Sequence, residues 1–244
     1  MATLSDIRSE IEAVIQSDLL NASYLSTTLN TRINRAITSI AGGIMMPNLQ
    51  LSPPLPDLYS SGTVSTSTSA AYKALPTTYQ RNVFMIADDS DERIPPPPGG
   101  DYYSFMLFLN SISDKSLGES GSIYRVCIKG NNLYYQGIPT ASEDLTVHFY
   151  RKPVAIALDA AVPDGIPDFL QVKLIKNYVI REFFADQIKE DFKSEQLRQS
   201  RIAWHDSEFY SAMQDLVSYI GDNEGEAVYY RGGNSSFQDL GVCD

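Results

Sequence analysis

The sequence predicts an α+β protein: a helical bundle, formed by the N- and C-terminal helices, with an inserted β-rich lobe. Apolar residues recur at spacings of three and four near both ends of the chain, whereas the middle alternates and is rich in Pro, Gly and Ser. Helices, then strands, then helices is an order typical of this class. We predict the bundle over 1–47 and 164–221, the lobe with two proline-rich arms over 48–163, and an extended tail over 222–244.

Two helices are predicted before residue 47. The first begins at Thr3 or Ser5, either of which can cap it. The second runs from about residue 23 to 41 and ends at Gly42-Gly43, because glycine is favoured just past a helix end. Their apolar faces consist of Leu4, Ile7, Ile11, Val14 and Ile15 in the first, and Leu29, Ile33, Ile37 and Ile40 in the second.

Strand signals occupy the middle of the chain. Alternation predicts strands over 122–129 and 145–150, and Gly130-Asn131-Asn132 predicts a tight hairpin between the first of these and 133–136. The apolar run 83–86 suits a buried strand, and the Ser/Thr-rich run 60–69 gives only a weak strand signal. Residues 102–109 favour a short helix. Proline-rich segments at 51–56 and 95–98 are predicted to be extended or turn-like.

Two long helices follow the strands. The Asp164–Asp168 segment resembles a helix entry, with Pro167 tolerated in the first turn. The first helix has a wide apolar stripe up to Phe184, which must be buried. The second, from about 193 to 220, is more polar, with an apolar face of Leu197, Ile202, Trp204, Phe209, Met213, Leu216 and Val217. We expect both to pack on the N-terminal helices, because such a pair is not stable alone.

The charge balance bears on function. The chain has 19 Lys and Arg against 30 Asp and Glu, a net charge of −11, which argues against gripping nucleic acid through its phosphates. No apolar run is long enough to span a membrane. Common catalytic and nucleotide-binding motifs are absent from the sequence, and the only cysteines are Cys127 and Cys243. We therefore expect no enzyme activity, no cofactor and no metal.

Single residues allow alternatives. Trp204 fits helix packing or an interface anchor, and His205 beside Asp206 suggests a polar helix face. The acidic run 88–92 could bind Ca²⁺, but it lacks the Gly and distal Glu of an EF-hand, so a solvated loop is favoured. The bases of the last helices, such as Arg181, are expected to pair with nearby acids at helical spacing. The tail sets aromatic and apolar residues among Gly and Ser, which suggests ordering against a partner.

Five segments, in order, resemble the tailed-bacteriophage head-to-tail adaptor (connector, or head completion) family. They are Leu29–Ala36 with the Pro47 stop, Gly62–Val64 with Ala71–Pro76 and Tyr79–Arg81, Tyr124–Gly130 with Leu133–Tyr135, Leu145–Pro153, and Ile166–Leu170. The resemblance implies a ring, typically of twelve copies, beneath the portal protein. It implies that the helical part docks on the portal and that the β lobe faces the tail or the next neck protein. The resemblance further implies that DNA passes through the central channel without specific binding.

The resemblance also implies where contacts lie. In several members the C-terminal segment reaches the portal, which here suggests Val228, Tyr229, Tyr230, Arg231, Phe237 and Leu240. For ring or neck contacts we select the stiff arms and the single tryptophan: Pro53, Pro54, Pro96, Pro97 and Trp204. The expected location is the virion head–tail junction after synthesis in the host cytoplasm. Two alternatives stay open: another neck, tail-tube or baseplate ring component, and a wall hydrolase with a carboxylate pair.

Overall fold

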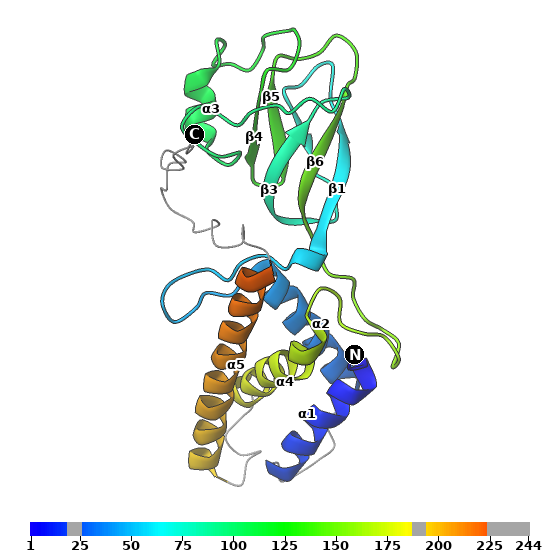
Figure 1. Cartoon of the computed structure of the whole chain (residues 1–244), viewed down its shortest axis with the longest axis vertical. Coiled ribbons are helices and arrows are strands. Elements are labelled where there is room, and N and C mark those ends of the chain that lie inside the picture. Colours follow the sequence, from blue (N-terminus) through cyan, green and yellow to red (C-terminus); the bar gives the residue numbers. More distant parts are fainter. Residues whose placement is uncertain (19–25, 187–193, 224–244) are drawn as a thin grey trace, which may run out of the picture. The chain divides into compact units, whose positions relative to one another are not determined.

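The computed structural model describes residues 1–18, 26–186 and 194–223 (Figure 1). The predicted α+β class, with helices at both ends of the chain, is confirmed. The described chain forms two compact units. Of the described residues, the helical unit comprises Met1–Leu58 and those from Lys152 to Asn223, and the β unit comprises Tyr59–Arg151. The segments 48–58 and 152–163, assigned to the lobe from sequence, thus belong to the helical unit.

Four helices build the helical unit: α1 (Leu4–Asp18), α2 (Ser26–Gly42), α4 (Asp168–Asp186) and α5 (Glu195–Asn223). Thr3 caps α1, because its Oγ1 accepts the Asp6 N–H at 3.2 Å and its own N–H donates to Asp6 Oδ2 at 2.9 Å. Gly43, with φ of 100°, follows the end of α2, where a left-handed residue closes a helix. The predicted apolar faces of both N-terminal helices are buried except at Val14, which is only partly buried.

Helix α4 is the centre of this unit and contacts α1, α2 and α5. It buries residues around most of its circumference, namely Leu170, Gln171, Leu174, Ile175, Asn177, Tyr178, Val179, Ile180, Phe183 and Phe184. Its two buried amides are hydrogen-bonded, as burial requires. Gln171 accepts the Ala2 N–H at 3.0 Å and donates to Ile166 O at 3.0 Å, and Asn177 donates to Lys173 O at 2.8 Å.

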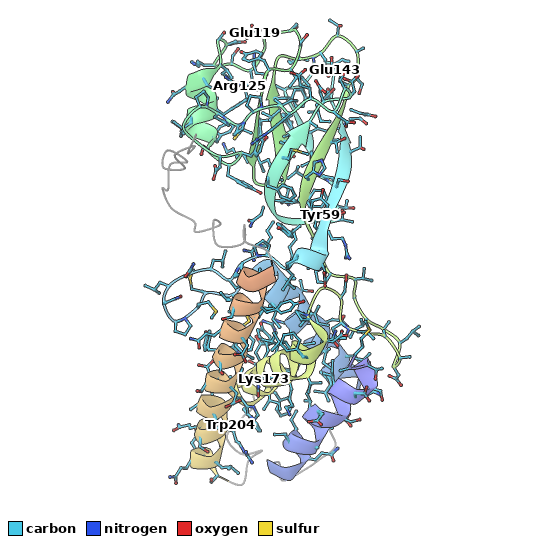
Figure 2. The ribbon with its side chains drawn as sticks, in the orientation of Figure 1. Tyr59, Glu119, Arg125, Glu143, Lys173 and Trp204 are labelled. Carbon is cyan, nitrogen blue, oxygen red and sulfur yellow. The ribbon has the colours of Figure 1, made fainter. Side chains whose placement is uncertain are left out.

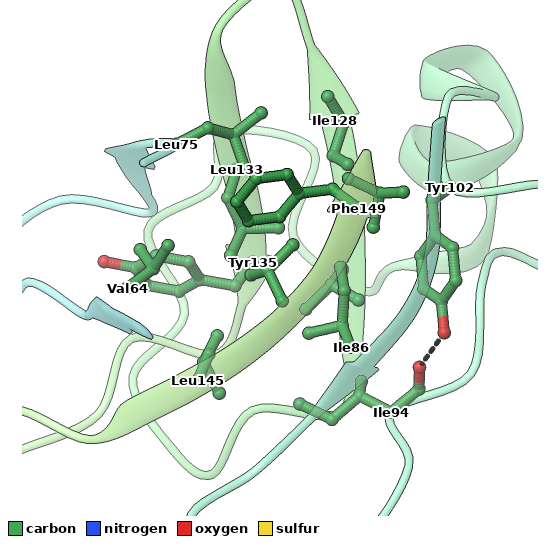
Figure 3. Close-up of a cluster of buried hydrophobic side chains, with 13 residues drawn as sticks. Val64, Leu75, Ile86, Ile94, Tyr102, Ile128, Leu133, Tyr135, Leu145 and Phe149 are labelled. Carbon is green, nitrogen blue, oxygen red and sulfur yellow. Dashed lines mark hydrogen bonds between the residues drawn. The ribbon is translucent and has the colours of Figure 1, made fainter. Parts of the chain in front are cut away.

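The β unit contains two three-stranded antiparallel sheets. The first has the order β1 (Tyr59–Ser65), β6 (Asp144–Arg151) and β3 (Tyr79–Ala87). The second has the order β2 (Tyr72–Ala74), β5 (Asn132–Gln136) and β4 (Arg125–Lys129). Buried side chains from both sheets form one core, in which Tyr102 donates from its hydroxyl to Ile94 O at 2.8 Å (Figure 3). The unit is therefore a small sandwich.

Helix α3 (Phe105–Ser111) covers the other face of the second sheet. Phe108 and Ile112 pack on Cys127 of β4, and the rings of Phe105 and Tyr134 meet edge to face at 5.2 Å. Strand β4 is therefore buried on both faces, which is why Cys127 is as buried as its neighbours despite the alternation expected from sequence. Burial raises the pKa of the Cys127 thiol to about 12, so the thiol stays protonated near neutral pH and is a poor nucleophile.

Gly165, just before α4, lies against the side chain of Leu58 in the short η1 helix (Pro56–Leu58). Its φ is +79°, and a Cβ at this position would lie 2.6 Å from Leu58 Cγ. We expect Gly165→Ala to destabilise the fold by about 2 kcal/mol or more, because it adds both backbone strain and overpacking. Urea unfolding followed by Trp204 fluorescence measures the change.

The Leu58→Ala variant separates these two causes. Leu58→Ala alone destabilises the fold because it leaves a cavity. In the Gly165→Ala/Leu58→Ala double variant, however, the atoms that the new Cβ would meet are absent. The loss in free energy of unfolding should therefore be smaller than the sum of the losses in the two single variants. A strictly additive double variant would contradict the proposed clash between residues 58 and 165.

Candidate assembly surfaces

A short hairpin protrudes between α2 and η1, seen as the blue loop beside α5 in Figure 1. Its ends are tied by Ser52 N–H to Ile44 O and by Ile44 N–H to Ser52 Oγ, both at 2.8 Å. Its tip is closed by Met46 N–H to Gln50 O at 2.8 Å. These bonds hold residues 44–52, here called the apolar hairpin, in a defined shape.

The apolar hairpin exposes large hydrophobic side chains. Leu49 at its tip is 85% exposed, Met45 55% and Leu51 47%. Leu49 also has φ of 61°, a left-handed conformation that is uncommon for residues other than Gly, Asn and Asp. The residues of 42–56 include no Lys, Arg, Asp or Glu, although 20% of the whole chain is charged. This segment has exposed apolar side chains, a strained backbone at Leu49 and no charged residue, and these are features of a contact surface.

A second apolar surface lies where α4 begins and α5 ends. Phe169 is 65% exposed and Tyr219 38%, and their rings meet edge to face at 5.3 Å. We call these two residues the aromatic pair. Nearby, Lys173 Nζ and Asp215 Oδ2 form an ion pair at 3.0 Å, and the side chain of Asp168, directly before Phe169, is about half exposed.

Trp204 lies on α5 (Figure 2) and is 52% exposed. Trp204 is therefore not on the buried face of the helix, as its expected role in helix packing required, and its alternative role as an interface anchor stays a prediction. The buried face of α5 consists of His205, Phe209, Ala212, Met213, Leu216 and Ile220. This face is rotated by about one residue from the predicted one, which places Trp204 at its edge.

His205 corrects a second expectation. It is 1% exposed, not part of a polar face, and its Nδ1 lies 2.8 Å from Asn177 Oδ1 of α4. Because Asn177 donates its amide to Lys173 O, the amide oxygen faces the imidazole and accepts its Nδ1–H. His205 therefore joins α5 to α4.

Arg181 also pairs differently from the prediction. Its Nη1 lies 2.7 Å from Asp206 Oδ1 of α5, and its guanidinium carbon stacks 4.3 Å from the centre of the Phe209 ring. The α4 acids pair with α2 instead, Asp186 with Arg32 at 2.9 Å and Glu182 with Arg35 at 4.0 Å. The expected pairing within one helix is therefore wrong for Arg181, because the central helix presents its charges to its neighbours. It holds for Arg198 of α5, whose Nη2 lies 2.8 Å from Oε1 of Glu195, three residues earlier.

The predicted proline contacts divide into two groups. Pro54 and Pro97 are buried, whereas Pro53 and Pro96 are partly exposed. A buried ring presents no surface to a neighbour, so the placement argues against a contact role for Pro54 and Pro97. The tail residues Val228, Tyr229, Tyr230, Arg231, Phe237 and Leu240 lie outside the described residues.

The remaining candidate features are these. In the acidic run, Asp88 Oδ1 accepts the backbone N–H groups of Ser90 and Glu92 at 2.9 and 2.8 Å. Across the described ranges, no group of three or more His, Cys, Asp or Glu side chains is placed to hold a metal ion.

None of the helices in those ranges combines the length and apolar character needed to cross a bilayer. His148 lies in β6, with its Nδ1 2.8 Å from the Tyr59 hydroxyl.

Comparison with known proteins gives no assignment: no family model matches the chain, and no curated protein is significantly similar to it. The surfaces that sequence reasoning missed are the apolar hairpin and the aromatic pair. A signal for the hairpin was available, namely an uncharged run in which large apolar residues are set among Pro, Asn and Gln. Phe169 gave no such signal, because it belongs to a stripe whose other members are mostly buried.

The different positions of Trp204 and Phe209 predict different effects on stability. Trp204→Ala should change the free energy of unfolding by less than about 1 kcal/mol, because half of the ring is already in water. Phe209→Ala should lower it by about 3–5 kcal/mol, because Phe209 is fully buried against Tyr178 and Arg181. Urea unfolding followed by circular dichroism measures both variants, and equal losses would contradict the assigned helix face.

Proposed function

We propose that the chain is a structural virion protein, a head-to-tail adaptor. In this proposal twelve copies form a ring that docks beneath the portal protein and joins the capsid to the tail. The chain is made in the host cytoplasm and acts at the virion head–tail junction. It has no catalytic role and needs no cofactor.

The observation that carries the proposal is the order of the adaptor-like segments along the fold. They fall on α2, then on β1 to β3, then on the β4–β5 hairpin, then on β6, and finally on the entry to α4. Each single segment is a weak signal. Their order supports the proposal, because the two ends of the chain form one helical unit and the β unit is inserted between α2 and α4.

The surface and charge of the chain fit such a role. A ring needs two different contact faces on each copy, and the helical unit exposes both the apolar hairpin and the aromatic pair. A net charge of −11 on each copy gives the channel a negative field that repels DNA from the wall instead of holding it. In the proposal the helical unit and the tail residues contact the portal, and the β unit faces the tail.

Purified full-length chain mixed with portal rings tests the proposal. We expect the chain to sediment with the portal and not alone, and we expect Tyr229→Ala/Tyr230→Ala to weaken the binding because these rings are the proposed anchors. Ser235→Ala/Ser236→Ala is the matched control in the same segment and should bind as the wild type does. A chain that never sediments with portal rings contradicts the proposal. Binding only to distal tail proteins would favour the alternative neck, tail-tube or baseplate component.

A further inference from the structure

We propose that residues 94–98, here called the proline ribbon, are a docking ligand for a partner protein of defined chemistry. The partner has a groove that is lined by tyrosine and tryptophan rings and rimmed by lysine or arginine. The proposal concerns the β unit alone, and it depends neither on the adaptor role nor on contact between copies. Four properties of the ribbon support it: its backbone, its anchoring, its exposed edge and the charges beside it.

The backbone of the ribbon is fixed by its sequence. Prolines occupy positions 95–98, and each ring locks φ at about −65°. Each of the residues 94–97 precedes a proline, which restricts its ψ to the extended range. These two restrictions together define a polyproline II helix, which has three residues per turn and no internal backbone hydrogen bonds. The ribbon therefore has this conformation in the free chain, before any partner binds.

Both ends of the ribbon are tied to the β unit. Ile94 is 5% exposed and packs in the core between the two sheets. Its N–H donates to Ile86 O at 2.9 Å, and its carbonyl accepts the Tyr102 hydroxyl at 2.8 Å (Figure 3). At the other end, the Gly100 N–H donates to Pro97 O at 3.0 Å. Because a folded unit holds the ribbon in place, docking loses little conformational entropy.

Exposure along the ribbon has the period of a polyproline II helix, in which residues three apart share one edge. Ile94 and Pro97 share an edge and are buried. Pro95 and Pro98 share the next edge and are exposed. Beyond them, Gly99 has φ of +75°, and apart from its chain neighbours no atom lies within 4 Å of the place a Cβ would take. The outward edge therefore presents two accessible proline rings at the spacing that aromatic-lined grooves bind.

The backbone of this edge is also available to a partner. The carbonyl groups of Pro95 and Pro96 accept no hydrogen bond from any described residue, and proline has no N–H of its own to donate. A partner can therefore approach both carbonyls with side-chain donors such as the tryptophan N–H or the tyrosine hydroxyl. Aromatic residues of this kind supply both the ring faces and the donors that the edge lacks.

The charges beside the ribbon specify the rim of the groove. Three exposed acids precede the ribbon, Asp89, Asp91 and Glu92, and the exposed Asp101 follows it. One exposed base, Arg93, lies among them. Because acids outnumber the base, lysine or arginine at the rim attracts this surface and an acidic rim repels it. A second copy of the chain, with a net charge of −11, does not meet this condition.

A WW domain prepared in two forms tests the proposal, because WW domains bind polyproline II segments in an aromatic-lined groove. One form carries lysines at the rim of the groove, and the other carries glutamates at the same positions. Calorimetry measures the affinity of each form for the full-length chain. Amide chemical shifts of the isotope-labelled chain locate the contact, because Arg93, Gly99 and Gly100 flank the ribbon and have amide signals.

We expect the lysine form to bind at least about tenfold more tightly than the glutamate form, and to shift these three signals. Pro95→Ala/Pro98→Ala should weaken the binding by about tenfold or more, because it removes both exposed rings. Pro53→Ala is the matched control, since Pro53 is a partly exposed proline of the helical unit, and it should bind as the wild type does.

A second variant keeps the ribbon itself intact. Asp89→Asn/Glu92→Gln removes two of the flanking charges and no proline, so it should weaken binding of the lysine form and strengthen binding of the glutamate form. Circular dichroism verifies that each variant is folded. This variant decides the role of the charges even if the proline variant disturbs the loop.

Several results would overturn the proposal. They are no binding of either form at millimolar concentration, equal binding of both forms, a proline double variant that binds normally, and a Pro53→Ala loss as large as its loss. Shifts of the same three signals with the concentration of the chain alone would assign the ribbon to a second copy and would also overturn it. Portal rings take no part in these measurements, so no outcome bears on the adaptor proposal.

Discussion

Burial of α4 is the constraint on which the helical unit depends. Its apolar residues face α1, α2 and α5 at once, and each large side chain contributes about 1.5–3 kcal/mol when buried. If several of these side chains were left exposed, the free energy lost would exceed the net free energy of unfolding of an ordinary domain, which is about 5–15 kcal/mol. The helix therefore cannot remain folded unless the two ends of the chain come together around it, and this leaves the β unit as an insertion between them.

The polar groups of α4 decide how its neighbours are aligned. Lys176 pairs with Glu10 of α1, Glu182 with Arg35 of α2, and Arg181 with Asp206 of α5. Pairs that are partly exposed contribute at most about 1 kcal/mol each, so their effect on stability is small. Their placement on three sides of one helix favours a single arrangement of the partners, and the buried Asn177–His205 hydrogen bond adds to this on the α5 side.

The sequence predicted the elements whose apolar pattern has a single period. Helices α1 and α2 and strand β6 bury the faces that their spacing indicates, because each packs on one side only. Prediction failed where a second layer changes the pattern. Cys127 is buried because α3 covers the outer face of β4. His205 is buried because α5 packs on polar positions of α4, such as Asn177, as well as on apolar ones.

The contact surfaces could be predicted only in part. Composition predicts that the run 42–56 is uncharged, but its hairpin depends on Ser52 and Ile44 pairing across eight residues, and its exposure depends on where the helices end. The proline arms were selected for stiffness, yet burial of Pro54 and Pro97 is decided by packing that no local pattern records. Trp204 lies one position beyond the buried face, a rotation too small to infer from helical spacing.

The proposed adaptor role depends on shape, charge and contact with identical copies. Electron cryomicroscopy of intact virus particles tests this account most directly. The account predicts that density fitting both units recurs around the channel axis immediately below the portal, with the helical unit nearest to it. Particles that contain no copy of this chain, or that carry it away from the channel axis, would contradict it.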